Sequence, residues 1–308
     1  MTFTLTGFNT VKREGVELTG SFTAAINAEM KVGAVEETIT VTGETPVVDL
    51  QSATKQRVID NAVLGGIPTG RVFANYAILI PGISQTNASD VGGSLGSNMT
   101  DLIAHGSHAD AQRILQNGVT VGTGTGGRSG SVPNIGAAQE VAVDFAAVDA
   151  SLATGGVRVN FIPRDGGNTS KGNGFFGFAN SSMQASNFTQ RVQTLGLLTP
   201  NSVSRVWDVN PGFGGPIKKD KLWYYATVRN QGAWDYVGGL FWNANENVPS
   251  AWTYVPDKTR PAISQQIWED AQLRLTWQAT PKNKIGLTYD QQDVNGNPVV
   301  SHISADLL

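Results

Sequence analysis

Residues 139–180 read QEVAVDFAAVDASLATGGVRVNFIPRDGGNTSKGNGFFGFAN, and the order of segments in this stretch decides the fold. Two short apolar segments, residues 141–145 and 157–162, have the β-branched composition that is typical of strands. After Pro163 comes a polar, glycine-rich segment, and then a phenylalanine-rich strand of a different kind. This order predicts a small domain that ends in a strand, a hinge over residues 164–173, and the first strand of a second domain.

The composition excludes several classes of protein. Hydrophobic residues make up 40 % of the chain, charged residues make up 15 %, and the net charge is −3. No apolar run approaches the roughly 18 residues of a membrane helix, which excludes a helical membrane protein, whereas strands of a transmembrane barrel leave only a weak hydropathy signal. The negative charge argues against a nucleic-acid partner. The absence of cysteine removes disulfides and thiolate metal sites from consideration.

The second half of the chain has the pattern of barrel strands. All seven tryptophans lie beyond residue 206, as membrane barrels place aromatic residues in girdles at both interfaces. Over residues 272–279, Leu273, Leu275 and Trp277 alternate with polar residues that include Thr276. We therefore expect Leu275 to face lipid and Thr276 to face the lumen, where a charged substitution would be tolerated far better than at Leu275.

Short turns and long loops are expected between these strands. Residues 281–283 form a short turn before a second alternating segment at 284–290, and another hairpin lies around 210–225. The polar and aromatic segments 181–203 and 231–264 read as extracellular loops. About five strands can be counted, against roughly 22 in a complete plugged barrel.

The N-terminal region is also rich in strand patterns. Residues 22–32 alternate between apolar and polar positions, and residues 35–43 combine threonine with Ile39 and Val41 between glycines. An exposed strand of the second kind leaves backbone N–H and C=O groups that a partner strand can pair with. The alternative is that it is the last strand of the preceding sheet, and the two interpretations are compatible.

These motifs together resemble TonB-dependent outer-membrane transporters, and most closely the Oar-like branch, whose members carry a carboxypeptidase-regulatory-like domain. In that family a Gly-Gly-x-x-Asn-x-x-x-(Lys/Arg) stretch closes the plug domain. Here Gly155, Gly156, Asn160 and Arg164 supply these residues, with one more residue between the glycine pair and the asparagine. Residues 214–223 resemble the Gly-Gly-Pro-Ile-Lys-x-Asp-(Lys/Arg)-Leu-(Trp/Phe) signature of the branch. The positions that match the plug motifs are Arg71, Pro81, Gly82, Asn117, Gly118, Gly155, Gly156 and Asn160.

The resemblance implies a mainly β fold in four parts. Residues 1–34 would be the C-terminal part of a regulatory-like β-sandwich, 35–50 a TonB-box-like strand and linker, 51–168 a small α/β plug domain, and 169–308 the first antiparallel strands of a large, truncated barrel. Within the plug, residues 71–80 are expected to form a helix that ends at Pro81-Gly82. The residues expected to contact TonB are Glu37, Thr38, Ile39, Thr40, Val41 and Thr42.

The function that the resemblance implies is uptake of a large or scarce substrate across the outer membrane of a Gram-negative bacterium. The expected partners are TonB with its inner-membrane energy-transducing complex, outer-membrane lipid, and an extracellular substrate such as an oligosaccharide, peptide or siderophore. The regulatory domain and the base of the plug would face the periplasm. The missing signal peptide and the unclosed C-terminal end lead us to expect an internal fragment. The alternative function is a soluble or surface β-rich adhesion or glycan-binding module.

No residues predict catalysis, a cofactor or a metal. Residues 122–129 fit glycine-rich nucleotide-binding patterns, but the Ser-Gly-Ser-Val-Pro that follows is a poor helix start, so a phosphate site is not expected. His105 and His108 are separated by Gly106-Ser107, which favours a loop in which they do not share a face. No serine lies in a nucleophile elbow. We therefore expect no enzyme activity.

Overall fold

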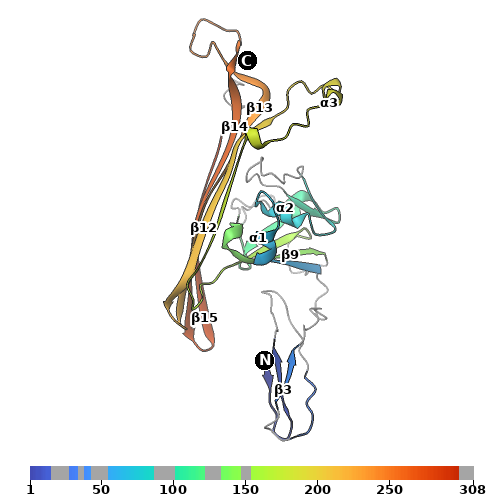
Figure 1. Cartoon of the computed structure of the whole chain (residues 1–308), viewed down its shortest axis with the longest axis vertical. Coiled ribbons are helices and arrows are strands. Elements are labelled where there is room, and N and C mark those ends of the chain that lie inside the picture. Colours follow the sequence, from blue (N-terminus) through green and yellow to red (C-terminus); the bar gives the residue numbers. More distant parts are fainter. Residues whose placement is uncertain are drawn as a thin grey trace.

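A computed structural model of the chain describes residues 1–14, 28–33, 38–42, 55–86, 101–121, 133–146 and 154–297. Most of the alternating segment at 22–32, Glu37, the glycine-rich loop at 122–130 and the C-terminal tail lie outside the described residues. The described part contains a small N-terminal sheet, a compact α/β domain and a tall curved sheet (Figure 1).

The N-terminal sheet has three strands in the order β1-β2-β3, with bounds β1 Thr2–Phe3, β2 Thr10–Glu14 and β3 Thr38–Thr42. The first pair is antiparallel and β3 runs parallel to β2. The β3 strand therefore lies at an edge of this sheet. It lies within the threonine-rich segment 35–43, whose composition predicts a strand.

The α/β domain is built on a five-stranded sheet in the order β4-β9-β10-β7-β8. The bounds are β4 Lys55–Asp60, β7 Arg113–Gln116, β8 Val119–Thr120, β9 Ala138–Ala146 and β10 Arg158–Pro163. A two-stranded sheet, β5 Ile83–Gln85 and β6 Leu102–Ala104, and the 3-10 turns η1 Ala109–Ala111 and η2 Ile135–Ala137 complete it. We call this domain the plug.

The described part of the plug has two short helices, and the sequence predicts only one of them. Helix α1, Asn61–Gly66, begins because the side chain of Asp60 accepts a hydrogen bond of 2.8 Å from the backbone N–H of Val63. Helix α2, Phe73–Ala77, is shorter than the predicted 71–80. It starts late because Arg71 has φ of +53° and cannot belong to a helix, and residues 78–80 continue the chain as turns. Helix α1 was not predicted, because its single turn is too short to show a hydrophobic period.

The core of the plug lies between this sheet and the helices. Val141, Val143, Val157 and Val159 are fully buried. The apolar segments at 141–145 and 157–162 form strands as predicted, within β9 and, from residue 158, within β10. Tyr76 of α2 is also buried, and its hydroxyl donates to the carbonyl of Leu64 at 2.9 Å. That bond satisfies the polar end of an otherwise apolar contact between the two helices.

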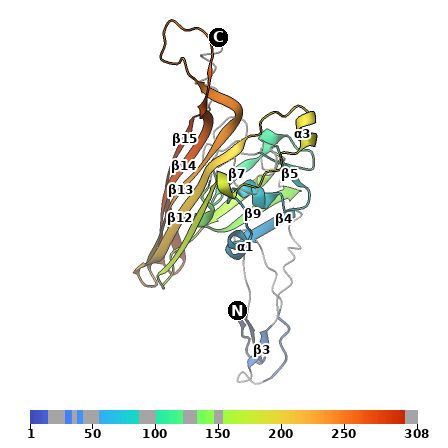
Figure 2. The same ribbon diagram turned by 45° about the horizontal axis from the view of Figure 1, so that its top comes forward.

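The tall sheet has five antiparallel strands in chain order, and we call it the wall (Figure 2). Its strands are β11 Lys171–Asn180, β12 Ser202–Lys218, β13 Leu222–Asn243, β14 Pro256–Thr280 and β15 Asn283–Asn297. The connection from β11 to β12 holds the 3-10 turn η3, Ser181–Met183, and helix α3, Gln190–Thr194. The described helices are all too short or too polar to span a bilayer.

The two faces of the wall differ in chemistry, as the alternation predicts. On the inner face, which packs on the plug, Asp208, Asn210, Thr227, Arg229 and Gln272 are buried. On the outer face apolar side chains are exposed, including those of Phe176, Val228, Leu273, Trp277, Ile285 and Leu287. A sheet that is polar toward the plug and apolar toward its surroundings has the pattern of a transmembrane barrel wall.

The predicted loop at 231–264 is wrong for most of its length. Strand β13 continues to Asn243 and β14 starts at Pro256, and the two stay paired from Gln231↔Trp268 to Tyr236↔Ile263. The polar and aromatic composition misled the prediction, because strands that extend beyond an apolar belt need no alternation of apolar residues. Only residues 244–255 connect the two strands.

Candidate functional site

The plug and the wall meet through polar side chains rather than through an apolar core. The largest cluster surrounds Asp208 on β12, whose carboxylate accepts two hydrogen bonds from Arg229 on β13, at 3.0 and 2.8 Å. The plug residue Arg71 brings its Nε to 3.7 Å from the same carboxylate. Asp208 is 6 % exposed and Arg229 is 5 % exposed, so one buried carboxylate faces two arginines.

The backbone before helix α2 is part of this cluster. Arg229 Nη2 donates to the carbonyl of Arg71 at 3.2 Å, and Gln231 donates to the carbonyl of Gly70 at 3.2 Å. The guanidinium of Arg71 also lies 4.3 Å above the ring of Phe175 on β11. These contacts fix the left-handed turn at Arg71 against three strands of the wall.

The electrostatics of Arg71 reflect its crowded position. Burial lowers the pKa of Arg71 from its ordinary value, and the nearby cation Arg229 lowers it further, while Asp208 acts in the opposite direction. A shared carboxylate between two like charges is stabilising only while it is ionised. Asp208 therefore holds the Arg71 end of the plug on the wall.

A second contact involves the turn η2. Asn134, which caps η2, donates to Asp270 on β14 at 2.7 Å. Gly136 lies against Asn210 so closely that a Cβ there would be 2.0 Å from Asn210 Oδ1. Tyr225 on β13 donates to the carbonyl of Gly136 at 3.1 Å. The absence of a side chain at Gly136 thus allows the plug backbone to touch the wall.

The hinge between β10 and β11 carries the third set of contacts. The guanidinium of Arg164 donates to the carbonyl of Ala138 at 3.1 Å and to the side chain of Asn61, which ties the start of the hinge to the plug. Its neighbour Asp165 points the other way. It accepts hydrogen bonds from Arg274 at 2.6 Å, Thr276 at 2.8 Å and Lys284 at 2.7 Å, all on the inner face of β14 and β15.

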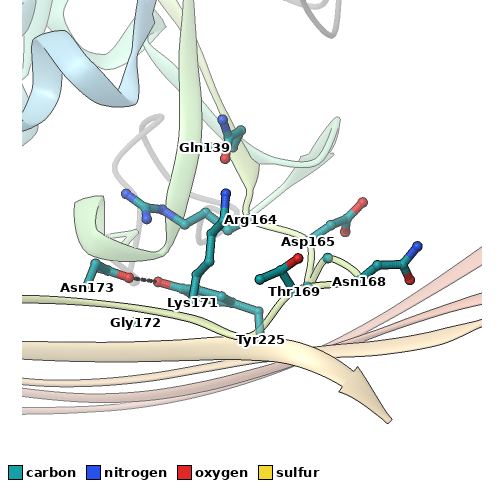
Figure 3. Close-up of a pocket in the computed structure, with 12 residues that line it drawn as sticks. Gln139, Arg164, Asp165, Asn168, Thr169, Lys171, Gly172, Asn173 and Tyr225 are labelled. Atoms are coloured by element: carbon teal, nitrogen blue, oxygen red, sulfur yellow. Dashed lines mark hydrogen bonds between the residues drawn. The ribbon is translucent and has the colours of Figure 1, made fainter. Parts of the chain in front are cut away.

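The hinge also touches the turn between β12 and β13. Asn168 Oδ1 accepts from the backbone N–H of Asp220 at 2.8 Å and from the indole of Trp223 at 2.7 Å. A Cβ on Gly166 would lie 2.3 Å from the carbonyl oxygen of Tyr224, so only glycine allows this approach. A cavity of about 410 Å³ opens between the hinge and the wall, lined by Arg164 and Lys171 among others (Figure 3).

We expect the contact of Asp165 to depend on pH. Burial alone would raise the pKa of Asp165, but hydrogen bonds from Lys284, Arg274 and Thr276 together outweigh it and hold the pKa below its usual value. The stability from a depressed carboxyl pKa is complete above the unfolded value of about 3.9 and is lost as the pH falls through the folded value.

The measurement for Asp165 is amide hydrogen exchange of residues 164–170 in the full-length protein, as a function of pH. Protection should be high near neutral pH and should fall below about pH 4 in the wild type. In Asp165→Asn, protection should be low throughout and show little change with pH. If protection depended on pH equally in the wild type and in Asp165→Asn, the carboxylate of Asp165 would not be the group that holds the hinge.

The residues that match plug motifs occupy four places, two of them around β10. Asn117 and Gly118 form the turn between β7 and β8 with φ of +51° and +81°, and the N–H of Gly118 donates to Asn160 on β10 at 2.9 Å. The turn before β10 brings Gly156 against the backbone of Ala111, where a Cβ would be 2.6 Å away. Nothing lies within 4 Å of a Cβ on Gly155.

The other motif residues lie elsewhere. Pro81 and Gly82 follow helix α2, and Gly82 has φ of +91° beside the ring of His105. Arg71 lies at the wall, in the cluster described above. Of the predicted site residues, the structure thus brings Asn160 together with Asn117 and Gly118. Arg71, by contrast, contacts the wall at Asp208 and Phe175.

Several residues of the interface were not predicted as site residues. They are Asn134, Asp165, Asn168, Asp208, Tyr225, Arg229 and Asp270. Asp208 and Arg229 could have been found, because their alternation places charges on the inner face of strands that carry apolar residues on the other. Thr276 is on the inner face as predicted, but it is 1 % exposed and donates to Asp165, so we no longer expect a charge to be tolerated there.

The two histidines that the structure describes, His105 and His108, contact an aromatic ring and a carboxylate. His105 stacks on Phe145 with ring centroids 6.4 Å apart, and His108 is exposed and 3.5 Å from Asp110. Within the described ranges, histidine and acidic side chains do not gather in groups of three or more that could hold a metal ion.

Comparisons with known proteins show which proteins this chain resembles in sequence and in fold. The search of family models found no match. The chain is 24 % identical over 230 residues to the TonB-dependent transporter Oar of Myxococcus xanthus, which covers 71 % of this chain and 20 % of that protein. Among solved structures, the outer membrane transporter YddB from Escherichia coli has a TM-score of 0.57 at 11 % identity, covering 78 % of this chain and 33 % of that one.

The siderophore receptor PirA from Acinetobacter baumannii has a TM-score of 0.53 at 18 % identity, covering 78 % of this chain and 32 % of that one. The chain thus spans a fifth of its curated relative and about a third of these structures. The predicted resemblance to TonB-dependent receptors and the mainly β fold are confirmed. These relatives are transporters and receptors rather than enzymes, as the sequence predicts.

Proposed function

We propose that this chain, which has the fold of a plug and adjoining barrel strands of TonB-dependent receptors, belongs to an outer-membrane transporter that is energised by TonB. In this proposal residues 51–168 are the plug, residues 169–308 begin the barrel, and residues 1–34 end a regulatory-like domain. The observation that carries it is a plug on a hinge, packed on the polar face of a sheet whose other face is apolar.

The chemistry of the plug–wall interface supports gating. Its contacts are hydrogen bonds and ion pairs of Arg71, Asn134 and Asp165, which water can replace when the plug moves. An interface of interlocked apolar side chains would resist such movement, because opening it would expose apolar area to water. The proposed substrate is a large or scarce solute such as an oligosaccharide, peptide or siderophore, which enters from the side of the 244–255 hairpin.

The proposal is tested by channel recordings on the full-length protein in planar lipid bilayers. The intact protein should insert and conduct little, because the plug fills the barrel. Deletion of residues 51–168 should give a large, stable conductance, whereas a deletion that removes only residues 1–34 should not. A protein that remains soluble and never inserts would contradict the proposal and favour the adhesion or glycan-binding alternative.

The proposed contact with TonB is the strand β3. Its composition, its position ahead of the plug and its place at the edge of the N-terminal sheet support strand addition. Main-chain hydrogen bonds would supply most of the binding energy, at about 0.5–1.5 kcal/mol each. Proline removes a donor and restricts φ, so Ile39→Pro or Val41→Pro should weaken binding of the periplasmic domain of TonB about tenfold.

The measurement is pull-down and titration with purified TonB domain, with Ile39→Val as the control that keeps every backbone donor. Thr40→Pro is a matched third variant, because the N–H groups of successive strand residues point to opposite edges. Strand addition predicts that positions 39 and 40 differ in sensitivity. Binding that survives the prolines at 39 and 41 would leave β3 as an ordinary strand of the N-terminal sheet.

A further inference from the structure

The outer face of the wall has a boundary that runs in register across its strands. Below it the outward side chains are apolar, and above it charged and amide side chains appear among the aromatic and apolar ones. On β14 the change falls between Ala271 and Glu269, and on β13 it falls between Val228 and Asn230. The two strands change at the same level, because Ala271 is paired with Val228 and Glu269 with Asn230. On β15 it falls at Gln291, the partner of Ala271.

The apolar part has the length that a bilayer requires. On β12 the outward apolar residues run from Val209 to Ile217, and a tilted transmembrane strand needs about 9–11 residues. The turns at Asp220 and Lys282 close the lower end of this belt. The boundary above it therefore marks the level at which outer-leaflet headgroups would surround the barrel.

A hydrogen-bonded row follows the upper side of this boundary. The indole N–H of Trp207 on β12 donates to Asn230 on β13 at 2.6 Å, and Asn230 donates to Glu269 on β14 at 2.8 Å. The ring of Trp207 lies over Gly232, where a Cβ would be 2.2 Å from the ring. The absence of a side chain at Gly232 and the hydrogen bond to Asn230 thus fix the orientation of the Trp207 indole.

Arg205 lies directly above that row. Its guanidinium carbon is 3.4 Å from the ring centroid of Trp234 and 5.3 Å from that of Trp207, and the two indoles meet edge to face at 6.1 Å. Arg205 is exposed, and among the described residues its guanidinium has no hydrogen-bond or ion-pair partner. Two indoles therefore hold a cation in place while its N–H groups stay open to the surroundings.

We propose that Arg205, held by Trp207 and Trp234, binds a phosphate of an outer-leaflet lipid headgroup. A guanidinium presents N–H groups in a planar fork that matches phosphate oxygens, and stacking on aromatic rings leaves that fork free. The side chain is on the face opposite the plug, so a substrate that passes through the barrel does not meet it. The inference rests on the proposed position of the wall in the outer membrane.

The test uses the full-length protein in neutral detergent, titrated with bisphosphorylated lipid A and, in parallel, with dephosphorylated lipid A. Binding is counted by native mass spectrometry. Wild type should prefer the phosphorylated lipid about fivefold, the contribution expected of one arginine near an anionic surface. Arg205→Gln should lose this preference, and Arg205→Lys should keep part of it.

The matched control is Arg191→Gln, which removes another exposed arginine from helix α3 and should leave the preference unchanged. A preference that persists in Arg205→Gln overturns the headgroup site, as does inorganic phosphate that displaces the lipid at equal concentration. Heat-modifiable migration on gels reports barrel folding. If the wild type shows no heat-modifiable migration, the proposed function and the headgroup site are both contradicted. If the wild-type barrel folds but shows no preference for the phosphorylated lipid, only the headgroup site is contradicted.

Discussion

Replacing Asp208 by asparagine is expected to lower the free energy of unfolding of the full-length protein by about 3–5 kcal/mol. The substitution keeps the shape of the side chain and removes its charge. Arg229, which is 5 % exposed, and Arg71 would then face each other without the carboxylate that both approach. An uncompensated buried charge costs more than the lost contact itself, because the charge is already removed from water.

The measurement for Asp208 is denaturant unfolding in lipid vesicles, compared with Asp293→Asn as a control at an exposed carboxylate on β15. The control should change the free energy by less than about 0.5 kcal/mol. Adding Arg71→Gln to Asp208→Asn should restore part of the loss, with a coupling energy of about 0.5–3 kcal/mol. Equal effects of the two aspartate variants would show that the cluster does not hold the plug.

Leu275→Arg should lower the stability of the barrel by about 2–4 kcal/mol if residue 275 lies near the bilayer midplane. Leu275 is on the outer face of β14 and is paired with Leu287, which is 64 % exposed. An arginine there would place a charge in hydrocarbon, away from the polar inner face. The cost should fall to about 0–1 kcal/mol for a charge near the interface.

The control for Leu275 is Gln265→Arg, on the same strand and the same face but above the boundary at Glu269. Both variants would be compared with wild type in a urea-unfolding series in vesicles. Thr276→Arg is unsuitable as a control, because it would displace the hydrogen bond to Asp165 at 2.8 Å. Similar costs at 265 and 275 would mean that the apolar belt is not the membrane-crossing part.

The pattern of residues along the chain determined the parts of the fold that depend on neighbouring positions. The central plug strands at 141–145 and 157–162, the hinge after Pro163 and the two faces of β14 and β15 were all predicted from local composition and alternation. A strand repeats every two residues whatever it packs on, so its faces can be assigned without knowledge of the partner.

Only the tertiary structure decided which of those positions meet each other. Asp165 and Thr276 are separated by 111 residues and Arg71 and Arg229 by 158, and no local period relates them. The same limit explains why the composition of 231–264 predicts a loop: residues 231–236 are held as a strand by pairing with β12 and β14, not by their own pattern. The inner face was predicted from the sequence, but the plug residues that it binds are set by packing between distant segments.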